Sequence, residues 1–349
     1  MSSLVREMKE RSSAYSHFFI PAAFLLVIAV AWSIFWFFVS RQTAAAVDHW
    51  LAQEERLGRN WSCPDRKIGG YPFKIEISCS DLAFSGRIAG AVMTGSVRGF
   101  QATSPLLRRD DLLVRLEPPF DATTEDGTVD MSLDWKDLYV QLEGPPGAYE
   151  QLVLAGTDVQ LQGRAADLPP LDGHFSELRS HLSLAQDRND NSYDFTFAVN
   201  DGVLPALGQI LNMQDSLYVQ LGGTLSQVPA GNVQTFADFL EQWRAAKGHL
   251  DIASARLRSG GVQFEATGGL DLDPQHRLNG KLDAVLAGFD KVFRQLNLDP
   301  GLFAAGKGLA GILGKGSGTP GRLDLPVGFS AGQVLLGHVP TPFQIPPLY

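Results

Sequence analysis

The chain has 349 residues, of which 44% are apolar, and it carries a formal net charge of −9. This composition is sufficient for a large core and argues against nucleic acid as a partner, because phosphate binding needs clustered Lys and Arg. The 36 Gly and 20 Pro residues interrupt the chain often, as expected when many short strands are joined by turns.

Residues 18–39 form an uncharged apolar run that is long enough, as a helix, to cross a hydrocarbon core of about 30 Å. Arg6, Lys9 and Arg11 precede this run and Arg41 follows it, so the positive-inside rule predicts that residues 1–17 are cytoplasmic and that the bulk of the chain is not. The other interpretation is a cleaved signal peptide, because Ala44–Ala46 offers the small residues that a signal peptidase accepts. The length of the run and Arg41 favour an uncleaved anchor.

The segment after the apolar run, residues 40–59, is predicted to be a membrane-proximal helix. It is followed by the stretch CPDRKIGGYPFKIEISC, which holds both cysteines of the chain, Cys63 and Cys79. Alternation in this stretch puts Phe73, Ile75, Ile77 and Cys79 on one face of a strand, and the glycines before it allow the NWSC segment to pair with that strand. In an oxidising compartment the two cysteines are expected to form a disulfide that staples this hairpin, the alternative being two buried thiols.

Strand alternation recurs at residues 112–118, 129–135, 138–144, 159–163, 193–199 and 217–223, and most clearly in a meander between Leu250 and Gly288. Helical spacing in two places, residues 236–243 and 289–296, predicts two short helices laid on the sheet. The predicted fold is mainly β (α+β), with an N-terminal transmembrane helix and a curved antiparallel meander sheet covered by a few short helices. We expect two similar lobes, residues 60–170 and 171–349, which divide somewhere near residues 164–175.

Motifs that would indicate chemistry are incomplete. Gly301–Gly308 has the spacing of a phosphate loop, but Gly308 stands where a Ser or Thr would hold magnesium. The segment from Asp187 resembles the start of a calcium loop, but Ser192 and Ala198 replace its Gly and Glu, so a hairpin turn is the better interpretation. The seven histidines form no zinc motif. We therefore predict no catalytic residue, no metal site and no cofactor, and an enzyme is the less expected class.

The anchor, the GGYPFKIEISC element with its upstream Cys63, and the ending LDLPVGFSAGQVLLGHVPTPFQIPPLY resemble a family of uncharacterised Gram-negative envelope proteins. This is the domain-of-unknown-function family numbered twenty-one twenty-five, and the resemblance extends from about residue 15 to the C-terminus. The meander around residues 264–290 is also similar in texture to AsmA-like proteins, which are single-anchored, β-rich and implicated in moving lipids between two membranes. These resemblances imply a single-pass inner-membrane protein whose bulk is periplasmic.

A curved sheet with one apolar face could accept acyl chains, with a gain of about 0.8 kcal/mol per buried methylene. The predicted lining of this hydrophobic groove is Phe73, Ile75, Ile77, Val262, Phe264, Leu270, Leu272, Leu278 and Leu282. The alternative is that these side chains pack against the covering helices. The predicted function is accordingly the binding or transfer of phospholipid or another hydrophobic ligand. A scaffold that binds an envelope protein through a sheet edge or the Pro-rich tail is the second hypothesis, and a lipid or cell-wall hydrolase is the third.

Overall fold

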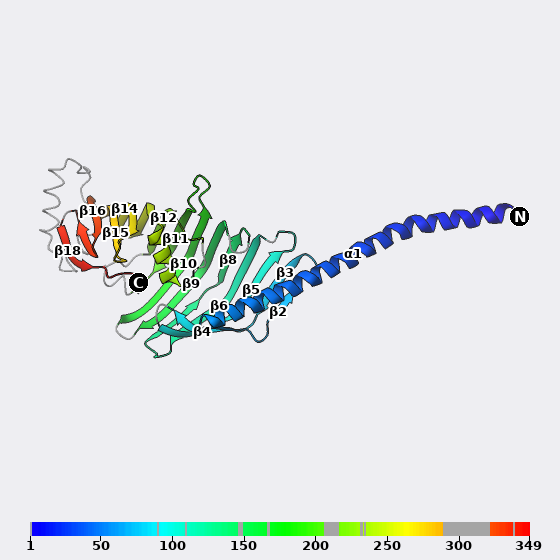
Figure 1. Ribbon diagram of the computed structural model, residues 1–349, viewed down its shortest axis with the longest axis horizontal. Helices are drawn as coiled ribbons and strands as arrows, with labels where there is room; N and C mark the ends of the chain where they lie inside the picture. Colours follow the sequence, from blue (N-terminus) through cyan, green and yellow to red (C-terminus); the bar gives the residue numbers. More distant parts are fainter. Residues whose placement is uncertain are drawn as a thin grey trace.

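The computed structural model describes residues 2–88, 91–108, 110–145, 149–165, 168–205, 216–230, 233, 235–288, 322–337 and 339–349. Within them a long N-terminal helix leads into a curled β-sheet, and the N-terminal part of the helix projects away from the sheet (Figure 1). The helices are α1 (Ser2–Arg56) and α3 (Phe236–Ala245). The strands are β1 (Arg59–Ser62), β2 (Lys67–Gly69), β3 (Lys74–Cys79), β4 (Leu82–Ile88), β5 (Ala91–Pro105), β6 (Asp111–Thr124), β7 (Val129–Asp134), β8 (Asp137–Glu143), β9 (Gln151–Ala165), β10 (Leu168–Leu184), β11 (Tyr193–Val203), β12 (Leu217–Leu225), β13 (Leu250–Ser259), β14 (Val262–Leu272), β15 (Leu278–Ala287), β16 (Arg322–Ser330), β17 (Gln333–Leu336) and β18 (Val339–Gln344).

Helix α1 joins the predicted transmembrane segment and the membrane-proximal helix in one element. It contains an apolar segment long enough to cross a membrane, and its residues 21–31 are exposed. The second part of the helix lies against the start of the sheet, where Glu54 pairs with Arg59 at 2.6 Å and Asp48 with Arg66 at 2.6 Å. The helix ends at Arg56, three residues before the end of the predicted segment, because the chain turns at Gly58 (φ +75°) and enters β1 at Arg59.

The strands form one antiparallel sheet in which neighbours in sequence are mostly neighbours in space. Strand β5 is long enough to pair with β3 at one end and with β4 at the other, and β6 pairs in the same way with β7 and β8. From β9 to β18 every strand pairs with the next. Because β9 and β10 pair directly, the ladder continues through residues 164–175, where we expect the boundary between two lobes; the division itself stays a prediction.

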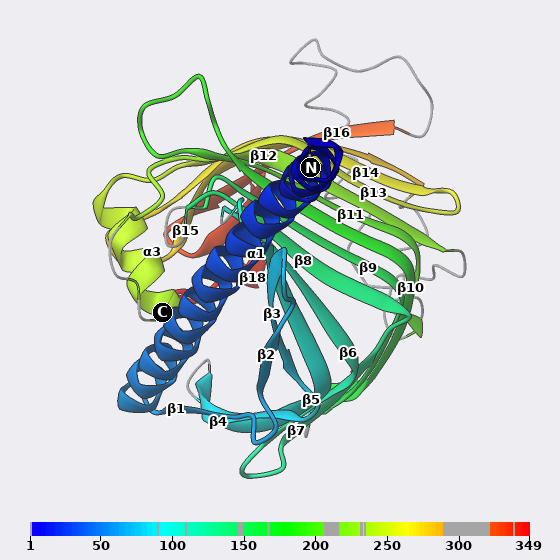
Figure 2. The same ribbon diagram turned by 90° about the vertical axis from the view of Figure 1, so that its right-hand side faces the viewer.

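The sheet curls strongly, so that its strands surround an inner side (Figure 2). Register shifts occur at Val97/Gly99, Val199/Gly202, Gly222/Gly223 and Ile252/Ala255, and bulges of this kind increase local twist and bend the strand. Trp135, which is 5% exposed, packs in one buried cluster with Val97 of β5 and Val159 of β9. Side chains from separated strands meet in this way on the inner side of a curl.

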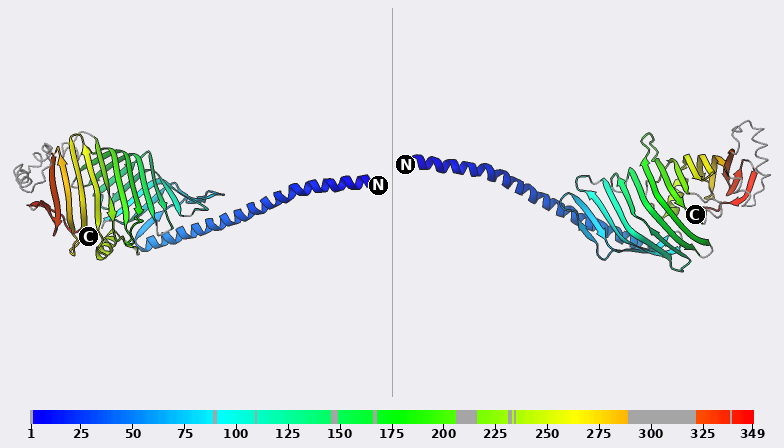
Figure 3. Two further views of the ribbon diagram at one scale, coloured as in Figure 1. Left: turned by 90° about the horizontal axis from the view of Figure 1, so that it is seen from above. Right: turned by 180° about the vertical axis from the view of Figure 1, so that it is seen from behind.

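Helix α3 connects β12 to β13 and lies at the ends of these strands. Its N-terminus is closed by a capping box between Thr235 and Asp238. The buried Trp243 donates its indole N–H to the carbonyl of Ser226 at 2.8 Å, and its ring occupies the space where a Cβ at Gly248 would lie. Figure 3 shows the short helix near the C-terminus, away from the projecting part of α1.

The predicted fold class is confirmed: the protein is mostly β, with an N-terminal apolar helix and a long antiparallel sheet. The meander from Leu250 is present as β13, β14 and β15. One pairing prediction is wrong, because the NWSC strand, β1, pairs with β4 and not with β3, whose partners are β2 and β5. The second predicted helix, residues 289–296, lies outside the described residues.

Candidate functional site: an apolar sheet face joined to the N-terminal helix

One row of directly paired residues runs across most of the sheet and is almost entirely apolar. We call it the central row. It crosses β2, β3, β5, β6 and β8 to β16, and at about 4.8 Å per strand it is on the order of 55 Å long. Only Ser180 in it is polar. Its members are Ile68, Ile77, Ala102, Val114, Val140, Leu154, Ser180, Phe197, Leu221, Ala255, Ala266, Ala284 and Leu325.

A second row on the same side follows the same pattern. It consists of Leu112, Leu142, Leu152, Leu182, Phe195, Gly223, Ile252, Gly268, Leu282, Val327 and Leu336. The two rows together define what we call the apolar face. Because successive residues of a strand point to opposite sides, this face is set by alternation and holds over the paired stretches between the bulges.

The opposite side of the same strands is more polar than the apolar face. The row one residue further along, from β6 to β16, carries three arginines among its ten members, and we call it the outer row. It contains Arg115, Tyr139, Ala155, Arg179, Ala198, Gln220, Arg256, Glu265, Val285 and Asp324. An antiparallel sheet with one polar and one apolar side normally covers the apolar side with other protein.

The described part of the chain covers the apolar face only in places. Its buried apolar clusters are the one around Trp135, which involves β4 to β10, and one around Val39 of α1. Further along the central row Ala266 and Ala284 are buried, whereas Phe197, Leu221 and Leu325 are only half-buried. Other large side chains on this side, such as Ile252 and Leu270, are buried, so the face keeps apolar surface exposed only in part. Exposed apolar surface of this kind is typical of interaction sites.

The apolar face is continuous with α1. Ile75 lies on the same face of β3 as Ile77, and it packs with Val39 of α1 and Leu106 in one buried cluster. Ile68, the first member of the central row, packs against that cluster together with Trp32 and Trp36. The central row therefore starts at the last part of the apolar run 18–39.

Eight of the nine residues predicted to line a groove share this face. Ile75 and Ile77 lie on it in β3, and register within β14 and β15 puts Val262, Phe264, Leu270, Leu272, Leu278 and Leu282 on the same side. Phe73 differs, since it lies in the turn before β3 and is 74% exposed. The structure assembles the residues on one face, and their predicted role in binding a ligand stays a prediction.

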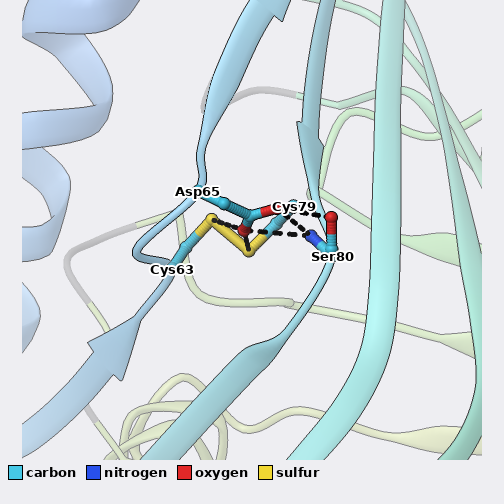
Figure 4. The surroundings of a disulfide bond; sticks show 4 residues. All are labelled: Cys63, Asp65, Cys79 and Ser80. Atoms are coloured by element: carbon cyan, nitrogen blue, oxygen red, sulfur yellow. Dashed lines mark hydrogen bonds between the residues drawn. A yellow bond between two sulfur atoms is a disulfide. The ribbon is translucent and has the colours of Figure 1, made fainter.

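The two cysteines form the expected disulfide, with Cα atoms 6.0 Å apart (Figure 4). Cys63 lies between β1 and β2, and Cys79 ends β3 just before β4. The bond therefore links the two connections that separate the β1–β4 pair from the β2–β3 pair. The carboxylate of Asp65 accepts hydrogen bonds from the backbone N–H and the hydroxyl of Ser80 at the same place, and these bonds lower the pKa of Asp65. Cys63, Asp65 and Cys79 are close enough to suggest a metal site, but sulfurs bonded to each other cannot act as thiolate ligands.

The other segments considered for chemistry have structural roles or lie outside the described residues. The segment from Asp187 is the turn between β10 and β11, as predicted, where Asp190 accepts hydrogen bonds from Arg188 and Ser192. Gly301–Gly308 is not among the described residues.

Sequence reasoning missed the contact between the apolar run and the sheet. Trp32 and Trp36 donate their indole N–H groups to the carbonyls of Pro72 at 2.8 Å and Lys74 at 2.9 Å. The signal that could have found it is two tryptophans four residues apart, which lie on one side of a helix and carry a donor that must be satisfied.

The fold and this face define a class of protein: an N-terminal apolar helix compatible with membrane anchoring leads into a curled antiparallel sheet with one apolar side. Within that class, residues 36–343 match the family model described as "Uncharacterized protein conserved in bacteria (DUF2125)", and the chain belongs to this family. No curated protein and no solved structure matches the chain. The likeness to AsmA-like proteins therefore stays a prediction.

Proposed function

We propose that this is a single-pass inner-membrane protein with a periplasmic bulk, which binds or transfers lipid or another hydrophobic ligand on its apolar face. The observation that carries the proposal is the continuity of the central row with α1. An acyl chain that leaves the bilayer beside Trp32 and Trp36 would meet Ile68 and Ile77 next, and apolar side chains from there to β16. No polar barrier interrupts this described path except Ser180.

The energetic argument is transfer between two apolar environments. Exposing one methylene to water costs about 0.8 kcal/mol of free energy, and burying it against protein recovers about the same amount. Transfer of a methylene from the bilayer to an apolar protein surface is therefore nearly neutral in free energy. A continuous apolar surface can therefore exchange acyl chains with a membrane without a large barrier. Half-buried residues such as Phe197 and Leu221 have surface left to contribute.

The orientation rests on charge. Arg6, Lys9 and Arg11 precede the apolar run, and Arg41 follows it, which favours a cytoplasmic N-terminus. The disulfide is in accord with a periplasmic sheet, because such bonds persist in oxidising compartments. We also propose that the role is non-catalytic, since binding on an extended apolar surface requires no reacting group.

Site-specific photocrosslinking tests the proposal in cells. A benzophenone amino acid replaces Phe197 on the central row or Phe264 on the same face, with Tyr139 of the outer row as the matched aromatic control. After irradiation, the full chain is purified and its peptides are analysed by mass spectrometry for phospholipid adducts. Lipid adducts at residues 197 and 264, together with none at 139, would support the proposal.

A probe at Phe37 of α1 provides the reference for lipid contact in the membrane. If this probe gives lipid adducts and both face probes give none, the apolar face does not bind lipid. Protein adducts at residues 197 and 264 would favour the scaffold hypothesis. The tail is less available for such a role than expected, because Tyr349 already donates a hydrogen bond to Glu241 of α3 at 2.7 Å.

A further inference from the structure

A compact apolar tip of the sheet lies beside the last part of the apolar run. We define the tip as the turn from Gly70 to Lys74 together with Leu106–Arg108. Four contacts fix it to α1 through three side chains of the helix: Trp32 to Pro72, Ser33 to Tyr71, Trp36 to Lys74, and the edge-on packing of the Trp36 and Tyr71 rings. Its depth is therefore set by the position of α1.

These contacts place the tip beside residues 32–36 of α1, nearer to the middle of the bilayer than Val39, the end of the apolar run. Trp32 precedes Val39 by seven residues, which corresponds to about 10 Å along a helix axis. Val39 is itself buried against Ile75 and Leu106. If residues 18–39 span the bilayer, the tip lies at the level of the headgroups and the outermost methylenes, and not above them in water.

Three of the exposed side chains of the tip are apolar or aromatic, whereas the exposed Lys74 and Arg108 carry charges that suit the level of the lipid headgroups. Phe73 is 74% exposed, Leu107 is 78% exposed and Tyr71 is 55% exposed. The two turns are joined, because the N–H of Leu106 donates to the carbonyl of Phe73 at 2.9 Å. Phe37 and Phe38 of α1 are also exposed, at 56% and 59%. Single exposed apolar residues are common on soluble proteins, but this group stands next to a membrane-length helix.

Four of the five carbonyls of the turn from Gly70 to Lys74 accept hydrogen bonds from within the protein, which provides an independent observation. The carbonyl of Gly70 accepts from the N–H of Lys74 at 3.1 Å, and the carbonyl of Phe73 accepts from Leu106. The carbonyls of Pro72 and Lys74 accept from the two indoles of α1, and Pro72 has no N–H to satisfy. Irregular backbone is tolerated at membrane depth only when its polar groups are paired within the protein.

We propose that this tip inserts into the periplasmic leaflet of the membrane, so that Tyr71, Phe73 and Leu107 contact lipid directly. The inference rests on the membrane anchoring in the proposed function, but not on lipid binding by the apolar face. It gives α1 and the sheet a fixed angle and depth at the bilayer. It also brings the first member of the central row, Ile68, to the lipid surface.

Depth-dependent fluorescence quenching tests the insertion in the full chain. A genetically encoded fluorescent amino acid replaces Phe73 or Leu107, and the protein is reconstituted into vesicles of phosphatidylethanolamine and phosphatidylglycerol with or without nitroxide-labelled lipids. Phe236 of α3 is the matched control, because it is the same residue type and is also 74% exposed. We expect strong loss of emission at positions 73 and 107 and none at 236, and iodide in the buffer should quench only the probe at 236.

A probe at Phe37 separates the possible failures. If position 37 is quenched by the labelled lipids and positions 73 and 107 are quenched only by iodide, the tip is in water and the inference is wrong while the anchor stands. If position 37 is not quenched either, α1 does not cross the bilayer and the inference falls together with the anchor. Quenching at 73 and 107 upholds the inference even if crosslinking finds no lipid on the apolar face.

Discussion

The indole of Trp36 donates a hydrogen bond to the backbone carbonyl of Lys74 at 2.9 Å, and this bond joins the apolar run of α1 to the first residue of β3. Trp32 makes the equivalent bond to Pro72 one turn earlier on the helix. Because both tryptophans lie on one side of α1, the sheet and the helix are held as one unit at the place where the chain is expected to leave the membrane.

Substitution of Trp36 by Phe should loosen this junction. The ring is largely retained and the donor is lost, so the cost should be about 0.5–1.5 kcal/mol, as for a single hydrogen bond. Hydrogen exchange of the amides from Lys74 to Cys79 in the full chain should accelerate. Trp50→Phe is the control, because Trp50 packs against Trp61 on another part of α1 and its substitution should leave these amides unchanged. Equal exchange in all three proteins would contradict the prediction.

The disulfide should contribute to stability without taking part in any chemistry. Replacement of both Cys63 and Cys79 by Ala removes a cross-link of sixteen residues' separation, for which chain entropy gives about 3 kcal/mol. Urea unfolding of the full chain in detergent should show a lower midpoint for the double variant, and the lipid adducts that we propose for a crosslinker at Phe264 should be the same in its folded state as in the parent. Loss of lipid binding in a double variant that remains folded would mean that the cysteines have another role.

The negative charge of Glu241 should stabilise the contact between the C-terminal Tyr349 and α3, and protonation of Glu241 at acid pH should weaken it. Arg244, with a further hydrogen bond from the Tyr349 hydroxyl, lowers the pKa of Glu241 from 4.5 to about 2, and the ring of His276 stacks on Tyr349 at 4.4 Å. The folded carboxylate binds its proton more weakly than the unfolded one. Its contribution is therefore complete above pH 4.5 and is lost as the pH falls toward 2.

Measurement of unfolding between pH 7 and pH 2 tests this assignment. Glu241→Gln should destabilise the protein near neutral pH, and the difference from the parent should vanish at the acid end. Glu55→Gln, which removes an exposed carboxylate from α1, is the control and should show a small difference throughout. A constant difference between the parent and Glu241→Gln at all pH values would show that the carboxylate charge is not what holds the C-terminus.

Local pattern was sufficient to predict much of the fold. Alternation at residues 250–288 found three strands, and the two positions of Ile75 and Ile77 were assigned to the correct common face. The reason is that side-chain period in a strand is a local property, which single-sequence reasoning can read. The apolar length of α1 is local in the same sense.

Partner choice between strands could not be read in this way. The prediction that β1 pairs with β3 followed from the glycines at 69 and 70, whereas β1 reaches β4, beyond the disulfide. Long strands such as β5 accept two partners on one edge, and nothing in the alternation of the short strands specifies which end each takes. The exposure of Phe73 was missed for a related reason: the alternation begins at Phe73, but this residue still belongs to the turn and β3 begins only at Lys74.

The last prediction concerns the centre of the apolar face, where a charge should block lipid contact. Leu221 lies on the central row between Phe197 and Ala255, and Gln220 precedes it on the outer row. Leu221→Glu would put a carboxylate among acyl chains, where desolvation is costly, whereas Gln220→Glu keeps an oxygen that can accept from Tyr218 and Arg256. With the photocrosslinker at Phe264, lipid adducts should fall sharply for Leu221→Glu and persist for Gln220→Glu.

The comparison requires that both variants remain folded, which circular dichroism and the thermal midpoint of the purified full chain establish. A less severe pair, Leu221→Asn and Gln220→Asn, serves if the carboxylate at 221 prevents folding. Equal lipid adducts at Phe264 in the two members of a folded pair would show that lipid reaches β14 without passing over Leu221. That result would contradict a path along the central row, which starts where Ile68 and Ile75 pack against Trp32, Trp36 and Val39, and lipid would reach Phe264 by another route.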